Sequence, residues 1–326
     1  MNRPDVSVIL VAHNRAESIP VVLSHLERQT FPAARYEVVL VDNASSDGTL
    51  DTVSRYACGA PVCIRVVRQE SGGEVAARNF GAREAAGRWL LFLDDDVIPG
   101  PALIEAHVSA QELHASRACV FGVVAPHPRL RHGALTRWFL PENRIDPAGE
   151  NTQFYEWSAE NLSLPRNLFL EGGGLPEDQP SPRFAAIDLL RRLRSADVEI
   201  VSEPRAQSFM WCSVRLEDER RRCYFQGRAL HRLYLQVRSP QMLRHYHVAR
   251  SSVRNFRDRL FIPFYLRTCQ DLEEDTRSYA SMYRRILRYE RHLGFRDAHE
   301  SRPAAWEPAP GRNAVPAAKG ARHSVL

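Results

Sequence analysis

Three adjacent carboxylates follow an apolar run in the first third of the chain. The run from Trp89 to Leu93 is continuous, and Asp94, Asp95 and Asp96 come directly after it. A continuous apolar run predicts a strand buried on both faces, so the carboxylates should emerge at its C-terminal end, where open α/β sheets bind ligands. Adjacent carboxylates repel one another, and a cation relieves that repulsion. Such oxygen ligands suit Mg²⁺ or Mn²⁺, which also bind phosphate oxygens; a plain charged turn is the alternative.

Strand and helix patterns alternate along the part of the chain that contains this cluster. Strand patterns lie at residues 6–11, 36–41, 64–67 and 89–93, with helical patterns between them at 17–28, 50–56 and 72–86. The alternation predicts a doubly wound, mainly parallel sheet. Asp42 follows the second strand, so Asp42 and Asp94 should lie at the same edge of the sheet, as a nucleotide site in such a sheet requires.

The patterns beyond residue 100 are less regular. They indicate a helix at 101–114, a strand at 118–124, a return to the sheet at 160–164, a glycine turn at 172–175, a basic helix at 184–194 and a strand at 198–201. Residues 126–153 are rich in Pro, Arg and Gly, which predicts a long connection. After residue 217 the apolar spacing is helical, and from Ser301 onward the Pro, Ala and Gly content predicts a disordered tail.

The composition is that of an ordinary globular protein of 326 residues with a net charge of +5. No stretch approaches the roughly 18–20 apolar residues of a membrane span. Residues 1–5 lack a signal-peptide pattern, so we expect a cytoplasmic protein. None of the six cysteines forms a Cys-x-x-Cys pair, which argues against a zinc site. Positive charge concentrates after Arg183, which could suit an acidic partner or a lipid surface; we expect no nucleic-acid partner.

Four motifs, taken together, resemble glycosyltransferase family 2. They are the Val8–Arg15 strand and loop, the Val41–Thr49 turn, the Ala77–Gly81 helix segment and Leu93-Asp94-Asp95-Asp96. The resemblance extends over roughly residues 5 to 215. It implies the GT-A fold, an α/β fold whose doubly wound, mainly parallel sheet has helices on both faces, here followed by a helical C-terminal extension. It also implies an inverting enzyme that uses a nucleotide-sugar donor.

The resemblance assigns roles to residues of the first half. Asp42 would accept hydrogen bonds from the edge of a nucleobase, usually uracil, and Arg78 would approach the base or the diphosphate. Asp96 would bind the divalent cation, Mn²⁺ or Mg²⁺, that bridges the diphosphate. The alternative for the arginines is ordinary surface pairing. The full nucleotide-binding set that the resemblance implies is Ala12, His13, Arg15, Asp42, Arg78, Asp94 and Asp95.

The second half departs from the family pattern. The family carries its general base in a Glu-Asp pair, and Ala185 and Ala186 stand at those positions. The family also often has a metal-binding histidine after the segment that corresponds to residues 203–206, and this chain has none there. Three explanations remain open: a displaced base, an acceptor that needs no strong base, such as a thiol or an anion, or binding without catalysis. The candidates for a displaced base are Asp188, Glu177 and Asp178.

The leading hypothesis is a metal-dependent glycosyltransferase. It would move a sugar from a nucleoside diphosphate donor, probably a UDP-sugar, to a hydroxyl of a small-molecule, glycan or lipid-linked acceptor, with inversion. The second hypothesis is a catalytically silent relative that binds a nucleotide sugar or a protein partner. A sugar nucleotidyltransferase is a third, weaker one, because its glycine-rich first loop and downstream lysine are absent.

The resemblance also suggests a division of the chain. Residues 1–125 would form the nucleotide-sugar-binding half, 126–215 the acceptor-binding half of the same domain, 216–300 the helical extension and 301–326 the tail. The basic, aromatic segment at 254–267 could lie on a membrane surface, which would place the protein at the inner membrane face, or could serve as a packing helix or a homodimer contact. Pro263 interrupts its amphipathic pattern, which favours packing.

Overall fold

The computed structural model describes residues 3–70, 72–114, 117–128, 160–211, 216–248, 260–267 and 280–304. Most of the predicted connection at 126–153 and most of the predicted tail lie outside these residues. None of the helices in the described ranges is long and apolar enough to cross a bilayer.

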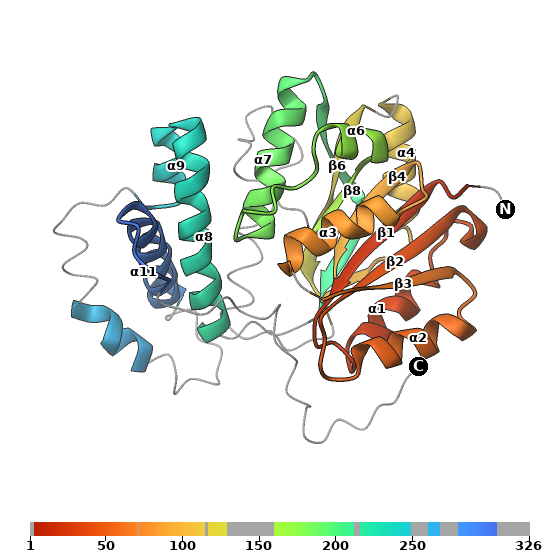
Figure 1. Ribbon diagram of the computed structural model, residues 1–326, viewed down its shortest axis with the longest axis horizontal. Coiled ribbons are helices and arrows are strands. Elements are labelled where there is room, and N and C mark those ends of the chain that lie inside the picture. Colours follow the sequence, from red (N-terminus) through yellow and green to blue (C-terminus); the bar gives the residue numbers. More distant parts are fainter. Residues whose placement is uncertain are drawn as a thin grey trace.

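An eight-stranded sheet forms the centre of the molecule, with the strand order β3-β2-β1-β4-β7-β6-β8-β5 (Figure 1). The pairs among β3, β2, β1 and β4 are parallel, as is β6 with β8, whereas β7 runs antiparallel to both of its neighbours and β5 runs antiparallel to β8. The strands are β1 Val6–Ala12, β2 Tyr36–Asn43, β3 Cys63–Gln69, β4 Trp89–Asp94, β5 Val97–Pro99, β6 Ala118–Pro126, β7 Asn161–Pro165 and β8 Glu199–Met210.

Helices cover both faces of the sheet. Because side chains alternate along a strand, Val8 and Leu10 of β1 pack in one core with α1, α2 and α4, while Ile9 packs in the other with α3, α6 and α7. The helices are α1 Ile19–Leu26, η1 Ala33–Arg35, α2 Thr49–Gly59, α3 Gly73–Glu84, α4 Leu103–Leu113, α6 Arg166–Glu171, α7 Pro182–Ser195, α8 Leu216–Val237, α9 Pro240–His245 and α11 Ala280–His299.

Helix α3 lies very close to the sheet. A Cβ at Gly81 would come within 2.8 Å of Ile9 and 3.0 Å of Val41, so a larger residue would push the helix away. This close approach explains the glycine in the Ala77–Gly81 motif, and it fixes the height of Arg78 above the strand ends.

The C-terminal helices α8 and α11 pack side by side as a parallel pair beside the sheet domain. Gly227 of α8 faces the backbone of α11, and Gly294 of α11 faces the backbone of α8, with no room for a side chain at either position. Tyr224 donates a hydrogen bond to Asp297 at 2.9 Å across this contact. Phe184 of α7 packs with Leu230 of α8 and joins the pair to the sheet domain.

Two elements differ from the sequence-based expectation. The strand expected at 198–201 is β8, which continues to Met210 despite Pro204. The proline and glycine after the acidic cluster do not simply end the run, because Val97 to Pro99 form the short strand β5, paired with the far end of β8. The sheet therefore holds the chain on both sides of the cluster.

Candidate functional site

The candidate site lies where β1, β2 and β4 end. The parallel register pairs Ala12 of β1 with Asp42 of β2, and Val11 with Asp94 of β4. The chain therefore brings the loop after β1, the turn after β2 and the acidic cluster to one edge of the sheet. Ala12 is fully buried at this edge.

The loops after β1 and β2 are tied to each other. His13 Nδ1 donates to the carbonyl of Asn43 at 2.7 Å. The Asn14 backbone, in the left-handed region with φ 54°, donates to Ser45 Oγ at 3.0 Å, and its side chain accepts from the Ser46 backbone at 2.9 Å. His13 is thus half-buried in a bond that holds the two loops together.

Asp42 is a buried carboxylate whose bonding capacity is unused. Its side chain has no exposed surface, and neither oxygen has a hydrogen-bond partner among the described residues. Among the described residues, Arg68 forms an ion pair with it, with Nε 4.0 Å from Oδ2. Burying an ionisable group without hydrogen bonds costs free energy, so a ligand that donates to Asp42 would relieve that cost.

Two arginines face the acidic cluster. Arg78 of α3 lies 2.5 Å from Asp94 and 2.7 Å from Glu74, one helical turn earlier. Burial lowers the pKa of Arg78, but Asp94 and Glu74 together raise it above its ordinary value, so the guanidinium stays charged. Arg15 lies 2.8 Å from Asp95. The sequence-based set missed Glu74, although its spacing of four residues from Arg78 is that of a helical ion pair.

Burial raises the pKa of Asp95, and the neighbouring Asp96 and Asp94 add to the rise, while Arg15 opposes it. A cation bound at this point would stabilise the ionised form of the three carboxylates. Asp96 is 5% exposed. The described residues contain no group of three metal-binding side chains. Mg²⁺ in substrate-bound sites is commonly held by one or two carboxylates plus substrate phosphates, and a single carboxylate such as Asp96 fits that donor set.

Residues 7–162 match the model of glycosyl transferase family 2. This segment belongs to that family. Among curated relatives, glycosyltransferase AglE of Haloferax volcanii is 38% identical over 106 residues, 32% of this chain and 35% of that protein. Validoxylamine A glucosyltransferase of Streptomyces hygroscopicus subsp. jinggangensis is 31% identical over 206 residues, 54% of this chain and 48% of that protein. The matched part thus spans less than half of each of these relatives.

Solved structures share the fold of this chain. The mannosyltransferase PcManGT from Pyrobaculum calidifontis, in complex with GDP-Man and Mn²⁺, aligns with a TM-score of 0.59 and 18% identity over 93% of this chain and 89% of that one. TarS 1-349 of S. aureus, in complex with UDP, aligns with a TM-score of 0.52 and 16% identity over 91% and 92%. These neighbours are GT-A transferases, and the chain has the GT-A fold.

Two buried alanines stand in this chain where family 2 members carry the Glu-Asp pair. Ala185 and Ala186 are fully buried, in the core between α7 and the sheet. Asp188, one turn further along α7, lies 3.0 Å from Arg191 and 3.1 Å from Arg192. Both of its oxygens are therefore used within its own helix.

The two other candidate bases lie in the connection before α7. Glu177 accepts a hydrogen bond from Asn79 of α3 at 2.9 Å, and Arg83 lies 3.8 Å from it. Asp178 pairs with Arg232 of α8 at 3.0 Å. The three candidates thus face three different partners. Glu177 is the one attached to the helix that carries Arg78.

Aromatic residues lie beside Asp96, in the region where the family often has its histidine. The Trp211 backbone donates to the Asp96 carbonyl at 2.9 Å. The His127 ring, which follows β6, contacts Trp211 at a centroid distance of 4.9 Å and Phe209 at 5.9 Å. Sequence reasoning missed this cluster because no local pattern links residue 127 to residue 211.

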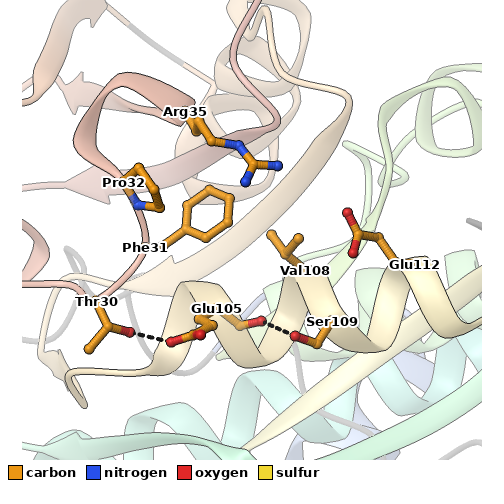
Figure 2. Close-up of a pocket in the computed structure, with 8 residues that line it drawn as sticks. All are labelled: Thr30, Phe31, Pro32, Arg35, Glu105, Val108, Ser109 and Glu112. Atoms are coloured by element: carbon orange, nitrogen blue, oxygen red, sulfur yellow. Dashed lines mark hydrogen bonds between the residues drawn. The ribbon is translucent and has the colours of Figure 1, made fainter.

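A separate hollow of about 240 Å³ lies between α4 and the connection from α1 to β2 (Figure 2). Thr30 donates to Glu105 across it at 2.5 Å, and Arg35 and Glu112 stand on opposite sides. It contains none of the residues of the candidate site. Thr30, Arg35 and Ser109 of its lining bond to Glu105, Asp5 and the Glu105 carbonyl, so we assign it no part in the chemistry.

Proposed function

We propose that the chain is a metal-dependent, inverting glycosyltransferase that moves a sugar from a nucleoside diphosphate, UDP in the first instance, to an acceptor hydroxyl. The observation that carries this proposal is the burial of the Asp42 carboxylate without a hydrogen bond from the described residues. Asp42 is an unsatisfied buried carboxylate at the end of β2, two strands from the acidic cluster at the end of β4. The N–H edge of a uracil would supply the missing donor.

The remaining groups suit a diphosphate. Arg78 is held charged by Asp94 and Glu74, beside the strand ends. Asp96 would hold a divalent cation that, when bound, stabilises the negative charge developing on the leaving diphosphate. The printed names of similar proteins agree with this class, since PcManGT was solved with GDP-Man and Mn²⁺ and TarS with UDP-GlcNAc.

Inversion requires direct attack by the acceptor hydroxyl on the anomeric carbon and removal of its proton by a base. Of the three candidates, Glu177 suits this role best. Asp188 is held by two arginines and Asp178 by one, all within about 3 Å, whereas the ion pair of Glu177 in the described part of the chain, with Arg83, is longer at 3.8 Å. A carboxylate in a close ion pair must leave its guanidinium partner before it can bond to an acceptor hydroxyl. The acceptor itself is a small molecule, a glycan or a lipid-linked molecule.

A catalytically silent relative is the second candidate function, and the buried alanines favour it. Ala185 and Ala186 leave no carboxylate at the usual base positions, and both are buried in the core. Such a protein would bind the donor through Asp42, Arg78 and Asp96 without transferring the sugar.

A titration separates the two candidates. UDP and several UDP-sugars would be added to the full chain with and without Mn²⁺, and donor hydrolysis would be followed alongside binding. The proposal predicts metal-dependent binding with slow hydrolysis of at least one donor. Binding that leaves every donor intact, even with a broad acceptor panel, would establish the silent relative. Absence of metal-dependent nucleotide binding would remove both candidates.

A further inference from the structure

Asn161 connects the two strands that hold the acidic cluster on either side. In the antiparallel pair of β7 with β4, Asn161 stands opposite Leu93, two strands' contact that ends directly before the cluster. Its side chain is buried, and its Nδ2 donates to the Ala206 carbonyl at 2.9 Å and to Ser208 Oγ at 3.1 Å. Both acceptors belong to β8, which pairs with β5, the strand that begins directly after the cluster. One residue therefore contacts the strand that enters the cluster and the strand that holds the chain beyond it.

Strand β8 changes its pairing with β6 where Asn161 contacts it. Phe121 pairs with Ser202, whereas Val123 pairs with Gln207, so β8 advances five residues while β6 advances two. Such a bulge bends the strand that contains it, and bulges are frequent next to active sites. Asn161 bonds to β8 inside this bulge and just beyond it. Its carboxamide thus fixes the direction that the second part of β8 takes.

The second part of β8 determines where the chain lies after the acidic cluster. All three residues of β5 pair with it, and the last pair is Pro99 with Ser208, the residue that bonds to Asn161. The Trp211 N–H donates to the Asp96 carbonyl at 2.9 Å. Asp96 is therefore held in place by β8, and the bend of β8 is held in place by Asn161.

His107 of α4 fixes the orientation of the Asn161 carboxamide. Because Nδ2 donates to β8, Oδ1 is the atom that faces His107, where Nε2 lies 2.7 Å away. The ring is neutral at pH 7, because burial lowers its pKa to about 4, so Nε2 carries the ring proton and Nδ1 accepts from Ser163 Oγ at 2.9 Å. Gln111 donates to the same hydroxyl at 3.1 Å. All four side chains are buried, so bulk water does not compete with these bonds and the carboxamide keeps its donor directed at β8.

We infer that Asn161 is a positioning residue for the divalent cation. By tying β8 to β7, it sets where Asp96 lies relative to Asp94, and so whether one cation can contact both Asp96 and the donor diphosphate. Loss of a group that orients a metal ligand typically lowers the metal affinity about tenfold or more. This role rests on the proposed function, in which Asp96 is the cation ligand, but it has a test of its own.

The dissociation constants of UDP without and with Mn²⁺, measured on the full chain, give a ratio that tests this role. Asn161→Ala removes both bonds to β8 and should lower the ratio towards one, by about tenfold. Ser208→Ala removes one of the two bonds and should lower the ratio about threefold. The affinity for UDP without Mn²⁺ should stay that of the wild type in both variants, because neither substitution touches Asp42 or Arg78.

Ser163→Ala is the matched control, because it removes a hydroxyl from the same buried network without removing a bond to β8. Its ratio should equal that of the wild type. Circular dichroism would verify that each variant is folded at the temperature of the titration. If Asn161→Ala does not fold, the comparison of Ser208→Ala with Ser163→Ala decides the question.

An unchanged ratio in Ser208→Ala and Asn161→Ala would overturn this role and leave the proposed function standing. An equal fall in Ser163→Ala and Ser208→Ala would overturn it too, since the cation would then respond to any damage in the buried network. Absence of Mn²⁺-dependent UDP binding in the wild type would remove the proposed function and this role together.

Discussion

Asn79 of α3 makes both backbone hydrogen bonds of Leu175, which is 96 residues away in the sequence. Its Oδ1 accepts from the Leu175 N–H at 2.9 Å, and its Nδ2 donates to the Leu175 carbonyl at 2.8 Å. The same Nδ2 also donates a hydrogen bond to Glu177 Oε1 at 2.9 Å. Gly174, with φ 64°, passes so close that a Cβ there would lie 2.9 Å from Asn79. One side chain thus fixes the turn before α7 against the helix that carries Arg78.

Replacing Asn79 by alanine should destabilise the protein by about 2–4 kcal/mol, because two buried backbone groups lose their partners. Urea denaturation would measure this change. Arg83→Ala, one turn further along α3 and 55% exposed, is the matched control and should stay within about 0.5 kcal/mol of the wild type. A small effect at Asn79 would mean that water or a rearranged turn satisfies Leu175.

Asp42 should show opposite effects on stability and on binding. Asp42→Asn removes a buried charge with no hydrogen bonds, so the free energy of unfolding should rise by about 1 kcal/mol or more. The same change replaces a charge-assisted hydrogen bond to the base by a neutral one, so UDP should bind about tenfold more weakly. Calorimetric titration and urea denaturation would measure both. Asp51→Asn, exposed on α2, should change neither; unaltered UDP affinity in Asp42→Asn would disprove the assignment.

The sequence was sufficient to place Asp42 and Asp94 at one edge of the sheet. β4 is a continuous apolar run, and continuous runs with intervening helices leave little choice of sheet type, so the edge that carries Asp42 and Asp94 follows directly. Segment β5 could not be foreseen. Three residues that end in Pro99 carry no strand pattern, and they are extended only because the distant β8 offers an edge to pair with.

The surroundings of the three candidate bases were less predictable for a physical reason. The sequence shows that Glu177, Asp178 and Asp188 are acids. Whether each can act as a base depends on the arginine with which it forms an ion pair, and those arginines lie on α3, α8 and α7. The Asn79 clamp and the His127–Trp211 contact are likewise tertiary. Local patterns carry no information on such pairs.

Asp96→Ala should abolish the part of UDP binding that depends on Mn²⁺ and leave the metal-independent part, because the cation loses its protein ligand. Titrations with and without Mn²⁺ would give the ratio of the two dissociation constants, which should fall to about one. Asp188→Ala is the control. It loses two ion pairs within α7 but should keep the metal-dependent ratio. A wild-type ratio in Asp96→Ala would show that the acidic cluster was assigned wrongly.

His107 of α4 should make the stability sensitive to acid. Burial lowers its pKa to about 4, although a hydrogen bond with Asn161 at 2.7 Å and the nearby Glu203 oppose the change. The histidine pKa in the unfolded chain is near 6.5. Between pH 6.5 and 4 the unfolded chain therefore binds a proton at His107 that the folded chain does not bind. Stability is therefore full above about pH 6.5 and falls as the pH drops towards 4, by about 2 kcal/mol between pH 7 and 5 from this residue.

The variant His107→Gln isolates that contribution. It should be less stable than the wild type at pH 7, because the bonds to Ser163 and Asn161 change, but its unfolding free energy should fall less between pH 7 and 5. All other histidines are common to both proteins, so the difference between the two slopes belongs to His107. Urea denaturation at the two pH values measures it, and equal slopes would refute the prediction.

Glu177→Gln should separate catalysis from binding. If Glu177 removes the acceptor proton, the variant should lose about a hundredfold or more in turnover while its UDP affinity stays that of the wild type. Gln keeps the size of the side chain and can still accept the Asn79 hydrogen bond, so the turn should stay in place. Asp178→Asn and Asp188→Asn are the matched controls. A large loss of turnover in Asp188→Asn, with none in Glu177→Gln, would move the base to α7 and require Arg191 and Arg192 to release it.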